Sequence, residues 1–265
     1  MSLTKHAFPI LLITLCSTAE ATDFRFSTGL RHFDRTEYSI SGAALNREHG
    51  VLAGIGLAMQ HTISRITHTA SIDLWHGTVE YTGGTQGGAP LLTETDQLIS
   101  SISYRISTTT EVDQLSLFLA GSWHSWHRDI SPTSSSLRLD ERYRWLTLEP
   151  GLRITHHLDD DLSSLVFGAG ILISRNGRLK VNLASLNLGE QVVDLGDGEG
   201  LHLTGSYIRK LSAEERLILT LEYEQLERDQ GKPKLLSNGT TLTTLTEPES
   251  RSTPVTLNIA YSISY

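Results

Sequence analysis

Cysteine is almost absent from this sequence. The only one, Cys16, falls in an N-terminal segment that we expect to be removed. The rest of the chain therefore cannot form disulfide bonds, and it offers no thiol as a nucleophile or metal ligand. The fold must be stabilised by packing and hydrogen bonding.

Long hydrophobic runs are missing as well. No apolar stretch approaches the roughly 20 residues that a membrane-spanning helix needs. A transmembrane β-barrel gives the same picture, because lipid-facing and lumen-facing residues alternate and each strand is only half apolar. The lack of such runs excludes membrane helices but leaves a membrane barrel open.

Other signatures are also lacking. The net charge is −8 and no basic stripe occurs, which argues against nucleic acid as a partner. Neither a Gly-x-Ser-x-Gly motif nor a helical His-x-x-x-His pair is present, so the usual hydrolase and zinc-protease signatures are missing. We expect no cofactor and no metal.

The N-terminal segment has the layout of a secretory signal peptide. It has a basic start at Lys5, an apolar run over 7–15, and a small-x-small site at Ala19-Glu20-Ala21. We expect cleavage after Ala21. Residues 22–265 contain no internal repeat or linker and are predicted to form one domain.

The last twelve residues predict a β-strand that ends on an aromatic side chain. Apolar residues alternate with polar or small ones from Val255 to Tyr265. The positions of Tyr261, Ile263 and Tyr265 resemble the C-terminal signal by which Gram-negative outer-membrane β-barrels are recognised for assembly. The resemblance implies an outer-membrane location and contact with the barrel-assembly machinery; the alternative is the last strand of a soluble sandwich.

Alternation elsewhere predicts about ten strands, with a range of 8 to 12. Their approximate bounds are 24–40, 50–63, 66–82, 96–107, 112–128, 141–156, 162–175, 200–210, 215–227 and 254–265. The predicted fold is an all-β, transmembrane, antiparallel up-and-down β-barrel. The hairpin-type dipeptides Asn176-Gly177 and Asn238-Gly239 indicate either strand extensions above the membrane or an extra strand pair.

Short and long connections alternate along the chain. The short ones lie near 64–65, 108–110, 158–161 and 211–214, and the long ones span 41–49, 83–95, 129–140, 176–199 and 228–253. Outer-membrane barrels place short turns in the periplasm and long loops outside, and an even strand count puts both termini in the periplasm. We expect outer-membrane lipid and lipopolysaccharide as surroundings.

Once the apolar faces are directed outward, charged residues face the lumen. They are Arg25, Arg31, Asp73, Arg105, Glu149, Arg153, Glu222 and Glu224. Both signs occur, buried charges persist only when paired, and a barrel of about ten strands is narrow. The pattern predicts a largely filled lumen with an ion-paired plug; the alternative is a conducting pore or a proton path.

The stretch "WHSWHRD", residues 123–129, combines aromatic and cationic side chains. On a strand, Trp123 and His127 share one face, whereas His124, Trp126 and Arg128 share the other. The two histidines point apart and cannot bind one metal. Trp123 is expected to anchor the membrane interface, as are aromatic residues at the opposite rim, namely Phe24, Phe26, Tyr104, Tyr207 and Tyr265.

An inward-facing group at the extracellular mouth is the candidate ligand-binding site. Its predicted members are Trp75, His124, Trp126, Arg128, Tyr143 and Trp145. Such rings and cations can stack on a sugar or hold an anion. The alternative is that they cap the charged plug.

The predicted size and layout are similar to those of the omptin family, outer-membrane proteases with an acidic pair facing a His-Asp pair. That resemblance implies catalytic roles for Glu94, Asp96, Asp197 and His202. The match is incomplete, because Glu94 stands where an aspartate is expected and the acid-x-His spacing is absent around His202. Lipid-modifying outer-membrane enzymes are a related alternative, without a specific residue pattern here.

The leading functional prediction is a non-enzymatic outer-membrane barrel whose external surface serves ligand binding, adhesion or envelope integrity. The alternatives are an omptin-like protease or lipid-modifying enzyme, and a narrow channel.

Overall fold

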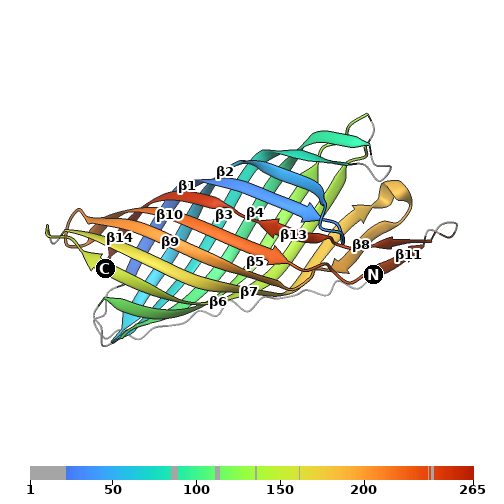
Figure 1. Ribbon diagram of the computed structural model, residues 1–265. Coiled ribbons are helices and arrows are strands. Elements are labelled where there is room, and N and C mark those ends of the chain that lie inside the picture. Colours follow the sequence, from blue (N-terminus) through green and yellow to red (C-terminus); the bar gives the residue numbers. More distant parts are fainter. Residues whose placement is uncertain are drawn as a thin grey trace, which may run out of the picture.

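The computed structural model describes residues 22–84, 89–110, 114–134, 136–160, 162–237, 239 and 242–265. In these ranges the chain forms an elongated, closed antiparallel β-barrel (Figure 1). The predicted signal peptide, 1–21, lies outside the described residues. No helix in the described ranges is long and apolar enough to cross a membrane.

Ten long strands form the barrel wall. They are β1 (Thr22–Tyr38), β2 (Ala44–Ile63), β3 (Ile66–Gly84), β4 (Pro90–Thr109), β5 (Leu115–Ile130), β6 (Leu139–His157), β7 (Ser163–Leu183), β9 (Gly198–Lys210), β10 (Glu215–Arg228) and β14 (Val255–Ser264). Each pairs with the next, and β14 pairs with β1 to close the sheet. Closure pairs backbone groups that lipid could not satisfy. The predicted ten-stranded barrel is confirmed.

The remaining elements extend one end of the wall, which we call the loop end. They are the 3₁₀ helix η1 (Ala184–Leu186), β8 (Gly189–Asp194), β11 (Lys234–Ser237), β12 (Leu242–Leu245) and β13 (Glu249–Ser252). β8 pairs with the end of β7, β11 pairs with β12, and β13 pairs with both β1 and β10. The opposite end, which we call the turn end, carries the short connections and Tyr265 (Figure 1).

The two hairpin-type dipeptides therefore add no strand to the wall. Asn176-Gly177 lies inside β7 and forms a bulge opposite Trp145, where the register with β6 shifts. Asn238 lies outside the described residues, and Gly239 follows β11, which pairs with β12 in a separate two-stranded sheet. Of the two readings, strand extension is the one seen at β7.

Several wall strands are longer at the loop end than the sequence predicted. β7 reaches Leu183 instead of residue 175, β4 begins at Pro90 instead of 96, and β2 begins at Ala44 instead of 50. The reason is the change of surroundings along each strand. Near the loop end the outward positions are mainly polar, so the apolar alternation that marks a strand fades while the backbone pairing continues.

A belt of apolar side chains surrounds the barrel between its two ends, and we call it the lipid belt. It includes Phe26, Leu30, Ile55, Leu57, Ile72, Leu74, Ile102, Leu117, Leu119, Leu146, Leu148, Phe167, Ile171, Leu219, Leu221, Leu257 and Ile259, all exposed on the outward face. So continuous an apolar surface is unfavourable in water. It is the outward face of a barrel embedded in lipid.

Aromatic side chains mark both edges of the belt. Trp123 stands outward on β5 at the edge nearer the loop end, opposite Leu146 of β6. At the turn end the ring of Phe24 contacts that of Tyr265 edge-on, with 6.1 Å between centroids. Phe26, Tyr104 and Tyr207 are also exposed on the outward face. Aromatic rings prefer the membrane–water interface, and this arrangement fits the predicted anchors.

Beyond the belt, the outward face at the loop end carries charged pairs. Arg47 contacts Asp34 at 2.5 Å, and Lys180 contacts Glu190 at 2.6 Å. Arg138 is paired with Asp129. Because these pairs are charged and Arg47, Arg138, Lys180 and Glu190 are exposed, this part of the wall stands outside the hydrocarbon region.

Candidate functional site

The lumen is divided into a packed layer near the loop end and a cavity below it. The packed layer, which we call the plug, is built on inward-facing aromatic and aliphatic side chains. Its buried members are Phe33, Leu52, Trp75, Val79, Ile99, Trp126, Tyr143, Leu179, Val181, Val193 and Leu195. The rings of Trp126 and Tyr143 stack with centroids 4.5 Å apart, and Phe33 lies 5.8 Å from Trp126.

Two arginines form the ionic part of the plug. Arg128 donates from Nε to Glu48 at 2.9 Å and from Nη1 to Glu141 at 2.7 Å. Arg35 donates from Nη2 to Glu247 at 2.9 Å and is also paired with Glu37. All of these side chains are at most 9% exposed. Both guanidinium groups are therefore engaged by protein carboxylates rather than open to a ligand.

The plug contains more acids than bases. Four carboxylates surround two guanidinium groups, so full ionisation would leave uncompensated negative charge in a buried layer. The pKa of Glu247, in the connection before β13, responds to this excess of negative charge. Burial, and then the charge of Glu37, raise the pKa of Glu247 to about 8, against the opposing effect of Arg35. Protonation of Glu247 relieves part of this negative charge.

Below the plug lies a cavity of about 570 Å³. Its walls carry all eight charged residues that the sequence assigned to the lumen: Arg25, Arg31, Asp73, Arg105, Glu149, Arg153, Glu222 and Glu224. Rows of serine and threonine hydroxyls lie between them; Ser71 and Ser103, for example, are 2.6 Å apart. The lumen is thus filled at the loop end and hollow and polar beneath, which differs from a plug running through its whole length.

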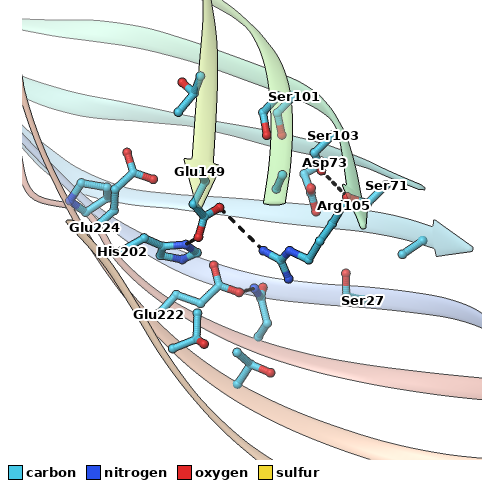
Figure 2. Close-up of a pocket in the computed structure, with 18 of the residues that line it drawn as sticks. Ser27, Ser71, Asp73, Ser101, Ser103, Arg105, Glu149, His202, Glu222 and Glu224 are labelled. Atoms are coloured by element: carbon cyan, nitrogen blue, oxygen red, sulfur yellow. Dashed lines mark hydrogen bonds and ion pairs between the residues drawn. The ribbon is translucent and has the colours of Figure 1, made fainter. Parts of the chain in front are cut away.

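One network stands out in the cavity. Figure 2 shows Glu149 of β6 between His202 of β9 and Arg105 of β4. Glu149 Oε1 lies 2.8 Å from His202 Nδ1, and Glu149 Oε2 lies 3.7 Å from Arg105 Nη2. Gly170 leaves room for this carboxylate, because a Cβ there would lie 2.5 Å from Glu149 Oε1. The network holds three strands together across the lumen.

The predicted ligand-binding residues all face the lumen but lie at two levels. Trp75, Trp126, Arg128 and Tyr143 are buried within the plug, each at most 5% exposed. His124 and Trp145 line the top of the cavity with their rings stacked 4.9 Å apart. Alternation along β3, β5 and β6 placed these side chains inward, but it could not show how deeply they are buried.

The plug residues that sequence reasoning missed are Arg35, Glu37, Glu48, Glu141 and Glu247. Four of them lie on strand segments beyond the lipid belt, and Glu247 lies in a connection. Continuing the alternation of β1 and β2 past the last apolar outward residue would have found Arg35, Glu37 and Glu48.

The four residues of the protease alternative are not brought together. Glu94 and Asp96 lie on the outward face of β4, exposed, while Thr95 and Gln97 between and beside them are buried. Asp197 is exposed and lies 3.5 Å from Arg175. His202 points into the cavity and contacts Glu149. An acidic pair facing a His-Asp pair across the mouth is not formed.

The terminal residues predicted to signal assembly lie on or just after β14. Tyr261, Ile263 and Tyr265 alternate on its outward face, and Tyr265 is 78% exposed. The backbone N–H of Tyr265 donates to the Thr22 carbonyl at 3.0 Å, which ties the chain terminus to β1. No cluster of three metal-ligating side chains occurs in the described ranges.

Comparison with known proteins depends on shape alone. No model of a protein family and no curated protein matches the sequence. Solved outer-membrane barrels do match. The chain has their fold. It is similar to the outer membrane protease OmpT from Escherichia coli, with a TM-score of 0.53 and 8% identity over 93% of this chain and 97% of that one. OprG from Pseudomonas aeruginosa matches at a TM-score of 0.43 and 10% identity, over 93% and 97% of the two chains.

Proposed function

We propose that this protein is an outer-membrane barrel closed to passage, whose loop end forms a non-enzymatic binding or structural surface outside the cell. The plug carries the proposal. It fills the lumen near the loop end with stacked rings and buried ion pairs. Such a layer blocks solutes while it bridges strands on opposite sides of the barrel, so it favours a rigid surface protein over a pore.

The orientation follows the general pattern of outer-membrane barrels. Short turns and the C-terminal residue share one end, and the longer connections with β8, β11 and β12 share the other. In our proposal the turn end faces the periplasm and the loop end faces outward. The exposed charged pairs beyond the lipid belt are suited to the aqueous side.

A non-enzymatic role is supported by the separation of the candidate catalytic groups. Glu94 and Asp96 face outward, whereas His202 faces the cavity and is occupied by Glu149. A scissile bond could not contact both sets at once, and shared contact is what general acid–base chemistry of this kind requires.

The proposal is tested by recording currents from purified protein in planar lipid bilayers. We expect no steady conductance above that of protein-free bilayers, because ions cannot pass the plug. Large, regular single-channel steps from the wild-type protein would contradict the proposal. A known open porin, purified in the same detergent, provides the positive control.

A gated channel is the second candidate, and one observation favours it. The cavity extends from Asp23 near the turn end up to Trp126 and Glu247 in the plug. Displacement of the plug alone would then connect the two sides of the membrane through the lumen. Brief openings of the wild-type protein under applied voltage, made frequent by Arg128→Ala, would favour this candidate; a silent Arg128→Ala barrel would argue against it.

A further inference from the structure

A group of cations lies on the outside of β6 and β7, remote from the lumen. Arg142 and Arg144 of β6 and Arg175, Arg178 and Lys180 of β7 all have exposed or half-exposed side chains on the outward face. In the register of the two strands, Arg144 lies directly opposite Arg178, and Arg142 lies directly opposite Lys180. We call these five side chains the basic patch.

The bulge in β7 brings the patch together. Arg175 and Arg178 are three positions apart, so on a regular strand they would face opposite sides. Asn176, with a φ of 57°, and Gly177 insert an extra residue, and Arg178 turns outward. Gly177 is held there, because its carbonyl accepts from Leu195 N–H at 2.9 Å and a Cβ would lie 2.7 Å from Leu195 Cβ.

The pairing of Arg144 with Arg178 is unfavourable by itself. Like charges directly opposite on neighbouring strands destabilise a sheet. The flanking cations have acidic neighbours: Arg142 lies 3.6 Å from Asp140, Arg175 lies 3.4 Å from Glu199, and Lys180 lies 2.6 Å from Glu190. Among the described residues, neither Arg144 nor Arg178 forms an ion pair, although Asp194 of β8 lies opposite Arg178 on its other side; Arg144 has Ser125 on its other side and so has no acid opposite it. An external anion between them would offset their repulsion.

The level of the patch indicates which anion. On β6, Arg144 shares the outward face with Leu146 and Leu148 of the lipid belt and lies next to them on the loop-end side. Arg175 of β7 lies opposite Leu146. Trp123, an interface aromatic, lies opposite Leu146 on the other side. The Arg144–Arg178 pair therefore lies where hydrocarbon gives way to headgroups. Guanidinium groups bind phosphate oxygens through paired hydrogen bonds.

We propose that the basic patch binds the phosphate groups of a lipid in the leaflet around the loop end, with the acyl chains lying on Leu146, Leu148 and Ile171. The proposal rests on the orientation given above, in which that leaflet is the outer one and its phosphorylated lipid is lipopolysaccharide. A bound lipid would neutralise the facing arginines and extend the barrel's contact with the membrane.

The test measures binding of purified, detergent-solubilised barrel to micelles of diphosphorylated lipid A. Arg144→Gln with Arg178→Gln is expected to weaken binding about tenfold or more, since the change removes two cations that lie next to an anionic lipid surface. The control is Arg47→Gln with Arg251→Gln, which makes the same charge change at exposed, outward positions on β2 and β13. The control should bind as wild type does.

Three results would overturn the proposal: unchanged binding by the Arg144/Arg178 variant, an equal loss in the control variant, or displacement of lipid A by millimolar inorganic phosphate, which would indicate a free-anion site. Folding of each variant is checked by the change in its gel mobility on heating. In the absence of phosphorylated lipid, the Arg144/Arg178 variant should be no less stable than the wild-type protein. Because bilayer conductance depends on the plug and not on the patch, this result and the closed-barrel test can fail separately.

Discussion

At the scale of single residues, Arg128 illustrates how burial decides a side chain's role. Alternation along the strand shows that Arg128 faces the lumen, and its neighbours Trp126 and His124 suggest a ligand-binding wall. In the structure its side chain is 3% exposed, and its guanidinium group donates to Glu48 and Glu141. No local pattern could show this, because Glu48 lies 80 positions earlier in the chain.

Replacing Arg128 should destabilise the plug severely. In Arg128→Ala, Glu48 and Glu141 lose their partner while remaining buried, at a cost of about 3–5 kcal/mol. The midpoint of urea unfolding in detergent, followed by tryptophan fluorescence, should fall accordingly. Arg47→Ala removes an exposed pair with Asp34 and should cost about 1 kcal/mol or less. Equal effects of the two changes would mean that Arg128 is not at the centre of a buried network.

Glu247 makes the loop end sensitive to pH. Its pKa is raised from 4.5 to about 8, so between those values the folded protein binds a proton that the unfolded chain releases. The free energy of unfolding should therefore decrease as pH rises from about 5 to 8. The rate of backbone amide hydrogen exchange at residues 246–252 should rise over that pH range by more than the rise expected for an unstructured peptide. Glu247→Gln should remove this additional increase. If the additional increase in exchange rate persists in Glu247→Gln, another titrating group is responsible for it.

At the scale of strands, the sequence was informative wherever lipid contacts the wall. Leu115, Leu117 and Leu119 predict β5 because one face of the strand must be apolar there. Beyond the belt that requirement ends, and the predicted strands were too short at the loop end, by six residues at β2 and β4 and by eight at β7. Glu48 lies in one of these segments, whereas Glu37 lies within the predicted range of β1 but beyond its last apolar outward residue, so the site was only partly predicted.

The bulge at Gly177 should be intolerant of side chains. In Gly177→Ala the new Cβ would lie 2.7 Å from Leu195 Cβ, so the extension formed by β7 and β8 must shift. We expect faster limited proteolysis within 184–197, with the barrel wall resistant. Gly121→Ala on β5 is the matched control, because nothing lies within 4 Å of its added Cβ. Protection equal to wild type in Gly177→Ala would show that the bulge is adaptable.

At the scale of the whole molecule, the plug separates the polar cavity from the aqueous side at the loop end. Ten strands and their closure could be predicted because alternation, turn spacing and the terminal aromatic all agree. The division of the lumen could not, since it depends on side chains that meet across the barrel from strands far apart in sequence.

The most direct test uses the scarcity of cysteine. Because Cys16 lies in the predicted signal peptide, single cysteines can be placed at Ser41 in the loop-end connection 39–43, at Ser101 in the cavity, and at Glu214 in a turn-end connection. A small charged thiol reagent is then added to intact cells and the labelling rates are measured. We predict rapid labelling of Ser41→Cys, and labelling of Ser101→Cys no faster than Glu214→Cys, which reports reagent leaking into the periplasm. Labelling of Ser101→Cys as fast as Ser41→Cys would contradict the sealed loop end.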